Sequence, residues 1–446
     1  MKTIHPLIAA LAALTLGFAQ PSCLAQAPAR PESEPEPAAP VVVRVATFNI
    51  EDLRTKELVE PVSERVKEAA EIIQRIRPTI ILINELAYDM PGAPGYDEEA
   101  GPGANARRLA ELLATEIREG VAPLQMTPFT AETNTGRASG FDLDRNGEIV
   151  TLIPPPTADG SQTAEGRAFG GDAWGFGTFP GQYGMALLVD DRLTIREEYI
   201  RTFRLFPWSR MPNALLPERE PDESENADES NPDTQTDEPS EENSGETAST
   251  APAQPKGPLM WYEDEAGTLF RLSSKSHWDI PVELPNGAVI HVLASHPTPP
   301  AFDGPEARNK KRNHDEIRFW ADYIDNAEYI LDDQRRPGGL PARSHFVIVG
   351  DLNADPDEGS SWDDPIGEML LASRWVGEDP APTSPVAIEG LDADDTARFG
   401  LRVDYVLPSK TLTVRRSGVW RHPVRRDSFP SDHFPVWADL VVPPAP

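Results

Sequence analysis

The stretch Ile80-Ile81-Leu82-Ile83-Asn84-Glu85 decides the fold class of this chain. Four consecutive apolar residues without polar alternation are typical of a strand that is buried on both faces of a sheet. Residues 62–76 carry apolar side chains at helical spacing and end before Pro78, which predicts a helix. Residues 41–48 form a β-branched run that predicts an earlier strand. The order strand, helix, strand indicates an α/β fold.

Further elements follow from the same patterns along the chain. We predict helices over residues 104–118 and 315–331, with irregular chain between the first of them and Gln182. Pro285-Asn286-Gly287 is typical of the turn of a β-hairpin. Strands are predicted at residues 185–189, 272–282, 289–295, 346–349, 403–407 and 436–442.

Polar side chains recur where the predicted strands end. They are Asn49 and Glu51, Glu85, His296, Asp351 and Asn353, Asp404, and Asp432 and His433. Ligand sites of sheet-based folds form where strand ends converge, so these distant residues are expected to meet in one crevice. Each motif alone also has a structural interpretation, because Gly-Asp-x-Asn is an ordinary turn sequence and Ser-Asp-His can cap a helix.

The combination of these motifs is more specific than any one of them. They occur in the order Phe48-Asn49-Ile50-Glu51, Asn84-Glu85, Ser295-His296-Pro297, Gly350-Asp351-Leu352-Asn353, Val403-Asp404-Tyr405-Val406 and Ser431-Asp432-His433-Phe434-Pro435-Val436. In this combination the chain resembles the endonuclease/exonuclease/phosphatase superfamily, to which pancreatic deoxyribonuclease belongs. The resemblance implies a four-layered α/β sandwich over residues 41–443, with two central mixed β-sheets flanked by helices. It also implies a hydrolase that acts on phosphoester bonds.

The resemblance assigns a metal site. Glu85 matches the family's metal-binding carboxylate, and Asp432 matches a second carboxylate on the metal side. Asn49 and Glu51 lie beside Glu85 as a further ligand or as a pair that orients the ligand. Carboxylate oxygens are the ligands that a hard Mg²⁺ or Mn²⁺ ion takes, and Mg²⁺ leaves room for a substrate phosphate. The expected cofactor is therefore Mg²⁺ or Mn²⁺.

The resemblance also assigns the catalytic residues. His433 and Asp404 match a dyad in which a neutral imidazole takes a proton from the attacking water while the carboxylate fixes its tautomer. Asp351 and Asn353 match residues that position the nucleophile and the scissile phosphate. His296 matches a histidine that some nuclease members use at the leaving oxygen.

Substrate phosphate contacts are expected from four residues. Asn49 and Lys275 match positions that contact the phosphate in some members of the superfamily. Residues 297–312 form a charged loop directly after His296, and its Arg308 and Arg312 form a cationic cluster that can attract phosphate. A solvated loop without function is the alternative for that segment.

A separate segment has the spacing of a calcium loop. Asp142, Asp144 and Asn146, followed by Gly147, place alternate oxygens where they can converge on an ion. Position twelve of such a loop is Ile153 here, so the usual bidentate glutamate is missing. A structural Ca²⁺ and a plain Asx-turn loop both remain open.

Net charge constrains the substrate. The chain of 446 residues carries a formal charge of −32, and residues 218–256 alone hold thirteen acidic residues against two basic ones. The composition of residues 217–257 predicts a disordered acidic insertion. The acidic remainder argues against a protein that grips duplex DNA through many phosphate contacts, although local nuclease activity is not excluded.

The N-terminus predicts export. Lys2, an apolar run over residues 6–18 and an Ala-Gln-Ala site at 25–27 are typical of a secretory signal peptide over residues 1–27, followed by a Pro/Glu-rich linker over residues 28–40. Cys23 is the one cysteine, so the mature chain would contain no disulfide. We expect a secreted or periplasmic protein without a stable membrane anchor.

Two classes of function remain at this point. The first is an exported phosphodiesterase or nuclease, whose partner is a nucleic acid or a small phosphodiester. The second is a non-catalytic binding protein that keeps the fold. The complete polar set favours the enzyme, whereas the loops between the motifs do not specify the substrate, and no protein partner is implied.

Overall fold

Strand β2 (Ile80–Leu86) lies inside a six-stranded sheet and is buried on both faces, as its continuous apolar run predicts. Ile80 and Leu82 pack into the core between the two large sheets, whereas Ile81 and Ile83 pack toward helices. This alternation follows from the two-residue period of a strand. The computed structural model describes residues 39–155, 157, 161–221, 258–377, 381–425 and 429–445, all of which belong to one contact unit.

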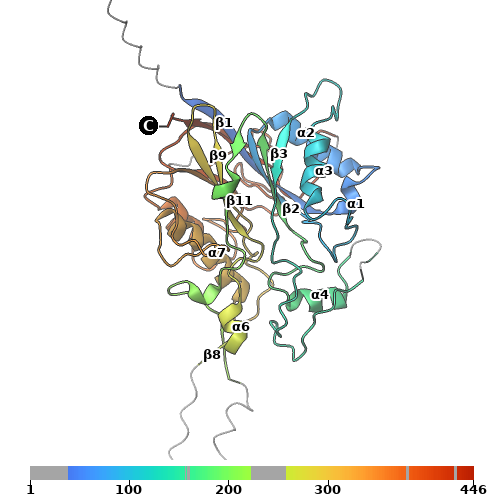
Figure 1. Ribbon diagram of the computed structural model, residues 1–446, viewed down its shortest axis with the longest axis vertical. Coiled ribbons are helices and arrows are strands. Elements are labelled where there is room, and N and C mark those ends of the chain that lie inside the picture. Colours follow the sequence, from blue (N-terminus) through green and yellow to red (C-terminus); the bar gives the residue numbers. More distant parts are fainter. Residues whose placement is uncertain are drawn as a thin grey trace, which may run out of the picture. The chain divides into compact units, whose positions relative to one another are not determined.

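Two mixed sheets form the centre of the fold (Figure 1). The first has the strand order β13 (Thr413–Val419), β14 (Val436–Val442), β1 (Val41–Leu53), β2, β4 (Met185–Asp190) and β3 (Met126–Phe129). The second has the order β12 (Asp404–Pro408), β11 (His345–Asp351), β10 (Val289–Ser295), β9 (His277–Glu283) and β5 (Thr194–Ile195), and β6 (Arg201–Thr202) also pairs with β9. In each sheet one pair of strands is parallel, β1 with β2 and β10 with β11, and the other pairs are antiparallel.

Helices cover the outer faces of both sheets (Figure 1). Helices α2 (Glu64–Ile76) and α3 (Ala104–Leu113) pack on the first sheet, and α7 (Arg308–Ile324) packs on the second. Three apolar cores therefore separate four layers, which confirms the predicted four-layered α/β sandwich.

Short elements complete the described chain. They are the helices α1 (Thr55–Leu58), α4 (Ala164–Gly171) and α6 (Asp264–Leu269), the 3₁₀ turns η1 (Glu197–Tyr199) and η2 (Trp208–Arg210), the π-helical η3 (Ile366–Leu371), and the strand pair β7 (Glu218–Arg219) and β8 (Leu259–Met260). No helix in the described residues is long and apolar enough to span a membrane.

Several predicted boundaries are corrected by the structure. The helix predicted at residues 315–331 is α7, which begins seven residues earlier at Arg308 and ends at Ile324. The strand predicted from residue 272 begins at His277, and the helix predicted to reach residue 118 ends at Leu113. The turn at Pro285-Asn286-Gly287 does join two antiparallel strands, β9 and β10.

Some predicted segments lie outside the described residues. These are the signal peptide over residues 1–27, the linker up to residue 38, and residues 222–257 of the acidic insertion. At the start of that predicted insertion, however, Glu218 and Arg219 form a strand and are not irregular chain.

The topology brings the predicted site residues to one end of the two sheets. The parallel strands β1 and β2 run side by side, with Asn49 opposite Asn84. In the second sheet β10 ends at Ser295 beside the end of β11, and Asp351 of β11 pairs with Asp404 at the start of β12. Since carboxyl ends of parallel strands meet at the same edge, polar residues far apart in sequence become neighbours.

Candidate active site

The first sheet contributes Asn49 and Glu85. Asn49 ends the regular part of β1, is 1% exposed, and donates from Nδ2 to Oε1 of Glu85 over 3.2 Å. The other carboxylate oxygen of Glu85 accepts the backbone N–H of Asp52 over 2.8 Å. These two donors fix the carboxylate of Glu85 at the end of β2.

The second sheet contributes Asp351. The Nδ2 atom of Asn49 also donates to Oδ2 of Asp351 over 3.0 Å, so one amide holds a carboxylate from each sheet. The other oxygen of Asp351 accepts the backbone N–H of Asn353 over 2.9 Å. Behind this contact, the buried side chain of Asn84 accepts the backbone N–H of Asp351 over 3.3 Å and thereby links the two sheets again.

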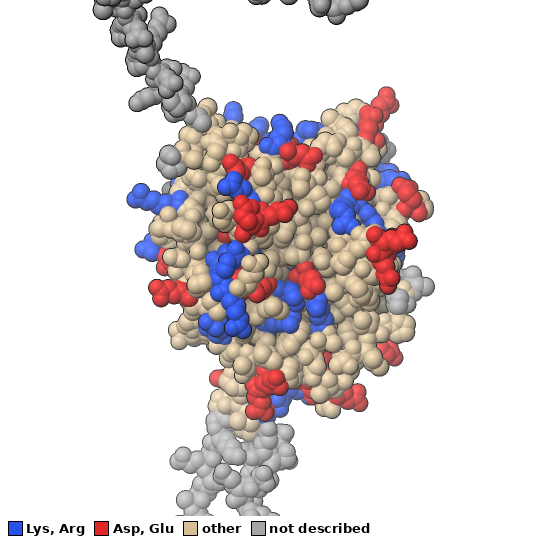
Figure 2. All heavy atoms as spheres, viewed as in Figure 1, with Lys and Arg blue, Asp and Glu red and all other residues tan. Residues whose placement is uncertain are grey.

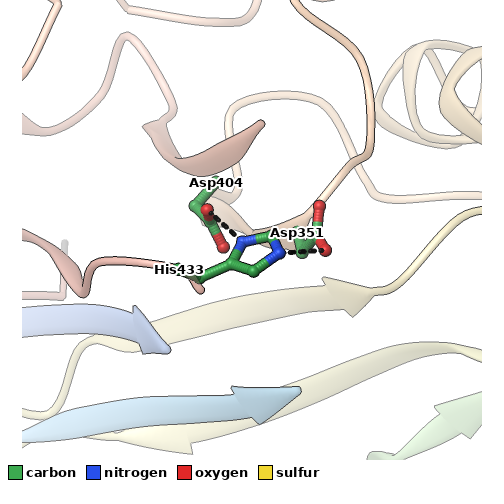
Figure 3. Close-up of side chains that lie close together, drawn as sticks. All are labelled: Asp351, Asp404 and His433. Carbon is green, nitrogen blue, oxygen red and sulfur yellow. Dashed lines mark hydrogen bonds and ion pairs between the residues drawn. The ribbon is translucent and has the colours of Figure 1, made fainter. Parts of the chain in front are cut away.

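His433 lies between two carboxylates (Figure 3). Its Nδ1 atom is 2.9 Å from Oδ2 of Asp404, and its Nε2 atom is 3.8 Å from Oδ2 of Asp351. Asp404 is fully buried and the side chain of His433 is 7% exposed. Ser431 fixes the backbone here, because its Oγ accepts the backbone N–H of His433 and donates to the carbonyl of Asn49. The predicted dyad residues are thus in hydrogen-bond contact.

Burial and charge shift the titration of this group of residues. Burial raises the pKa of Asp351 to about 7, and burial also raises the pKa of Glu85. Burial disfavours the charged imidazole of His433, but the carboxylates of Asp404 and Asp351 outweigh it and raise its pKa to about 10. The site therefore combines buried carboxylates that resist ionisation with an imidazole that attracts a proton.

Three more predicted residues surround Pro297. Lys275 Nζ donates to the carbonyl of Pro297 over 3.2 Å, and Asn353 Nδ2 donates to the same oxygen over 3.2 Å. His296 is 3% exposed, and its Nε2 atom lies 3.4 Å from Oδ2 of Asp351. Burial lowers the pKa of Lys275 and, well below its usual range, that of His296. A neutral imidazole at His296 can accept or relay a proton at this carboxylate.

Asp432 and Glu51, two of the predicted metal ligands, lie at the solvent-exposed edge of the site. The side chain of Asp432 is 45% exposed, with Oδ1 3.9 Å from Nε2 of His433. Glu51 is exposed, and among the described contacts no hydrogen bond or ion pair joins its carboxylate to Glu85. The structure brings Glu85, Asp351, Asp404 and His433 into one cluster and leaves Glu51 and Asp432 facing solvent beside it.

Several residues near the candidate site have a strained backbone conformation. Glu51, Asp52, Glu85, Tyr183 and Asn353 have φ values of 48°, 44°, 64°, 56° and 55°. Non-glycine residues in this left-handed region cost on the order of 1–3 kcal/mol each and are retained where surrounding contacts hold them, often at functional sites. These residues lie near the ends of β1, β2 and β11 and just before β4, so the backbone around the site is held in an unfavourable conformation.

Asp52 is a site residue that sequence patterns did not identify. Its backbone N–H binds Glu85, while its Oδ2 accepts Arg54 Nε over 2.9 Å and Gln182 Nε2 over 3.0 Å. Its Oδ1 is buried without a hydrogen-bond partner. The polar residues Asn49, Glu51 and Asp52 at the end of β1 indicated a site here, but periodicity alone could not select between the two adjacent acids.

The predicted phosphate contacts of Arg308 and Arg312 are not supported by the structure. Arg308 begins α7 instead of lying in a loop, and it donates to the carbonyl of Leu143 over 3.0 Å. Arg312 is buried and donates to the carbonyls of Leu272, Trp174 and Arg271. Because its guanidinium donates to these backbone carbonyls, Arg312 has a structural role.

The predicted calcium loop has converging carboxylates. Ligand atoms of Asp142, Asp144 and Asp172 lie within 4.8 Å of one another. The same oxygens accept backbone N–H groups, including those of Asn146 and Gly147 at Asp142, which is the pattern of Asx turns. The side chain of Asn146 accepts the backbone N–H of Glu148 and does not join the three carboxylates.

The comparison with protein families now identifies the class. The family model described as Endonuclease/Exonuclease/phosphatase family matches residues 46–433. The chain belongs to this family. Each activity in the family name hydrolyses phosphoester bonds, so the protein is a hydrolase that acts on phosphoester substrates.

Three solved structures to which the chain is similar are described as members of the same family. An endonuclease/exonuclease/phosphatase from Beutenbergia cavernae is 17% identical with a TM-score of 0.47, over 90% of this chain and 72% of that one. A family protein from Leptotrichia buccalis is 13% identical with a TM-score of 0.43, over 89% and 99%. One from Bacteroides vulgatus is 12% identical with a TM-score of 0.41, over 90% and 98%. Among curated proteins none matches significantly.

The donor set fits the divalent metal on which this family depends. Ligand atoms of Asp351, Asp404 and His433 lie within 4.8 Å of one another, and Oδ1 of Asp404 is buried without a hydrogen-bond partner. Glu85, whose side chain is 20% exposed, adds a further carboxylate. Because ionised carboxylates are costly to bury unless a cation compensates them, this cluster of acids favours a metal ion.

Proposed function

We propose that the protein is an exported phosphodiesterase or nuclease that uses Mg²⁺ or Mn²⁺ and hydrolyses P–O bonds by attack of water. The observation that carries this proposal is the position of His433 between Asp404 and Asp351, at 2.9 Å and 3.8 Å. A hydrogen bond from Nδ1 to Asp404 fixes one tautomer and leaves Nε2 as a base directed into the crevice.

Different residues of the chain act on the attacking water, the phosphate and the leaving oxygen. His433 Nε2 takes the proton of the attacking water, and Asp404 stabilises the imidazolium that forms. Asp351, held by Asn49 and Asn353, orients the water for in-line attack. Lys275 and His296 lie near Asp351, and they would stabilise charge that develops on the phosphate and the leaving oxygen.

Glu85 is the first candidate to hold the metal ion, together with Asp351, and Glu51 and Asp432 complete the set from the rim. When bound, the ion supplies positive charge that neutralises the phosphate oxygens. With positive charge beside Asp351, the imidazole of His433 would be protonated less readily, and its Nε2 could act as a base.

Export is proposed from the N-terminal sequence. Residues 1–27 have the charged, apolar and small-residue parts of a signal peptide in the correct order. Mass spectrometry of the protein recovered from a secreting host tests this, with Pro28 expected as the first residue. Recovery of the intact N-terminus in the cytoplasm would contradict it.

Hydrolysis of bis-(p-nitrophenyl) phosphate, plasmid DNA and p-nitrophenyl phosphate, each with Mg²⁺, Mn²⁺ or EDTA, tests the activity. Turnover is expected to require metal and to be lost in His433→Ala. His422→Ala is the matched control, because His422 is exposed and its ring contacts Trp420. If metal has no effect, or if His433→Ala retains wild-type turnover, the proposal fails.

A further inference from the structure

Three arginines from separate segments meet beside the catalytic crevice. Arg137 follows β3, Arg204 follows β6, and Arg271 precedes β9. Arg137 Nη1 and Arg204 Nη2 lie 3.0 Å and 3.1 Å from the same oxygen, Oε2 of Glu132. Two guanidinium groups therefore share one carboxylate oxygen, and each remains partly open to solvent, at 32% and 16%.

Arg271 adds a third guanidinium with neutral partners. It donates to Oδ1 of Asn134 over 2.5 Å and lies 4.7 Å from the ring centre of Trp174. Burial, and then the charges of Arg204 and Arg137, lower its pKa to about 10. The carboxylates of Asp333 and Glu132 oppose this shift, and the two neighbouring guanidinium groups add to the effect of burial.

Asp333, the second carboxylate near the cluster, already accepts hydrogen bonds from other groups. Asp333 accepts the hydroxyl of Thr202 and the backbone N–H groups of Arg204 and Leu205. Glu132 and Asp333 together face three guanidinium groups. An additional anion would therefore complete the charge balance, and a phosphate group presents several acceptor oxygens to guanidinium donors.

The cluster is tied to the catalytic crevice through Asn134. Its backbone N–H donates to the carbonyl of Lys275, and its side chain donates to the carbonyls of Arg204 and Ser273 over 2.7 Å each. Arg271 is four residues from Lys275, so their Cα atoms are at most about 14 Å apart. Asn134 thus joins the cluster to the segment that carries Lys275.

The surface charge is mixed on a local scale. Figure 2 shows basic and acidic side chains interspersed over the viewed face. A nucleic-acid strand carries one phosphate for about every 3.4 Å of helix axis, so a phosphate a few nucleotides from the scissile one can reach such a cluster. A small diester has a single phosphate. That phosphate binds at the catalytic residues, so a small diester leaves none for the arginine cluster.

We infer that Arg137, Arg204 and Arg271 form a subsite for a non-scissile phosphate of a single nucleic-acid strand. This inference rests on the proposed function and assigns its substrate class. The subsite attracts a strand locally, although the chain as a whole carries a charge of −32. It contacts the backbone of the strand and so selects for phosphates without reading bases.

Kinetics with two substrates test this inference. We compare wild type with the double variant Arg137→Gln/Arg204→Gln on a short single-stranded oligonucleotide and on bis-(p-nitrophenyl) phosphate. The KM for the oligonucleotide is expected to rise about tenfold relative to that for the diester, as when about one charge-assisted hydrogen bond is removed. The slope of log KM against log salt should also become shallower by about 0.7 for each phosphate that the variant no longer binds.

Two further variants sharpen the result. Arg192→Gln is the matched control, because Arg192 is 79% exposed and pairs with Asp190 on the turn after β4. Glu132→Gln removes the shared carboxylate and should lower the KM for the oligonucleotide while keeping all three arginines. That opposite shift is informative even if the double variant does not fold, which circular dichroism would show.

Each outcome decides between the two proposals. If the diester is cleaved but the oligonucleotide is not, or if the ratio of the two KM values does not change, the subsite is overturned. If neither substrate is hydrolysed with any metal, the proposed function fails. Fluorescence anisotropy of a labelled oligonucleotide then tests the subsite separately, and equal or absent binding by wild type and the double variant would overturn it.

Discussion

The side-chain amide of Asn49 donates to Oδ2 of Asp351 over 3.0 Å, from one sheet of the sandwich to the other. The same nitrogen also donates to Glu85 over 3.2 Å. Two carboxylates from different sheets are therefore held at one point by one group. Their relative position depends on Asn49 and on the packing between the sheets.

Replacing Asn49 should damage catalysis more than stability. In Asn49→Ala, the carboxylates of Glu85 and Asp351 lose their common donor, and a displacement of about 1 Å can cost on the order of 10²-fold in rate. We expect kcat to fall by about that factor and activation to need more Mg²⁺. Asn286→Ala, in the hairpin turn between β9 and β10, is the control. Unchanged kcat would refute this role.

Asp404→Asn tests the dyad. An amide at this position can hold the wrong tautomer of His433, and in a comparable dyad of another enzyme class this change lowers kcat by about 10⁴-fold. We expect a loss of about 10³- to 10⁴-fold here. The pKa of His433 should also fall, because the carboxylate of Asp404 is the strongest of the groups that raise it. NMR titration of the imidazole in both proteins measures this shift.

Metal binding should lower the pKa of His433. In the metal-free protein the carboxylates raise this pKa to about 10, so the imidazole is protonated at neutral pH. Positive charge next to Asp351 offsets that attraction and disfavours the imidazolium. NMR titration with and without Mg²⁺, under conditions without turnover, should show the lower pKa with the ion. An equal or higher pKa with Mg²⁺ would place the ion away from this cluster.

The sequence predicted the central layers well because their residues are decided by burial. The short, unbroken apolar run Ile80 to Ile83 favours a strand with two covered faces, and β2 is one. Edge elements were missed for physical reasons. β13 (Thr413–Val419) carries exposed arginines at the sheet edge, and β3 contains Pro128, which is tolerated only at an edge. Helix α4 was missed because it contains three glycines, which have a low helix propensity.

The candidate site was predictable where a motif coincides with a strand end. Asn49, Glu85, Asp351, Asp404 and His433 are brought together as their positions on the strands require. The roles of the charged residues after His296 were not predictable in this way. Local sequence does not show which arginine side chains will donate to backbone carbonyls. The same limit applies to the arginine cluster, whose members come from three loops that only tertiary packing brings together.

Calcium binding at the Asp142 loop remains a prediction. Convergence of Asp142, Asp144 and Asp172 within 4.8 Å concentrates negative charge that a Ca²⁺ ion would neutralise. The wild-type Tm should then rise with Ca²⁺, and Asp142→Asn/Asp144→Asn should abolish that increase. Mg²⁺ is the control ion, since it demands stricter geometry. No difference in the Tm increase between wild type and variant would leave the loop as a set of Asx turns.

Acid should weaken the cross-strand cluster around Asp439. This carboxylate in β14 pairs with Arg44 of β1 over 2.7 Å and with Arg416 of β13 over 2.7 Å. Burial alone would raise the pKa of Asp439, but the hydrogen bonds from Arg44 and Arg416 outweigh it and lower the pKa. Because the folded pKa lies below the unfolded one, the ionised carboxylate stabilises the fold above the unfolded value of about 3.9.

The contribution of Asp439 should therefore be lost as the pH falls through its lowered folded pKa. Asp439→Asn should reduce the free energy of unfolding by about 1.5–3 kcal/mol at neutral pH, the range for hydrogen bonds to charged groups. The difference from wild type should shrink below about pH 4, since protonation makes the two side chains alike. Urea denaturation at several pH values measures it, with the exposed Asp191→Asn as control. A difference that stays constant into acid would show that packing, and not charge, is what Asp439 contributes.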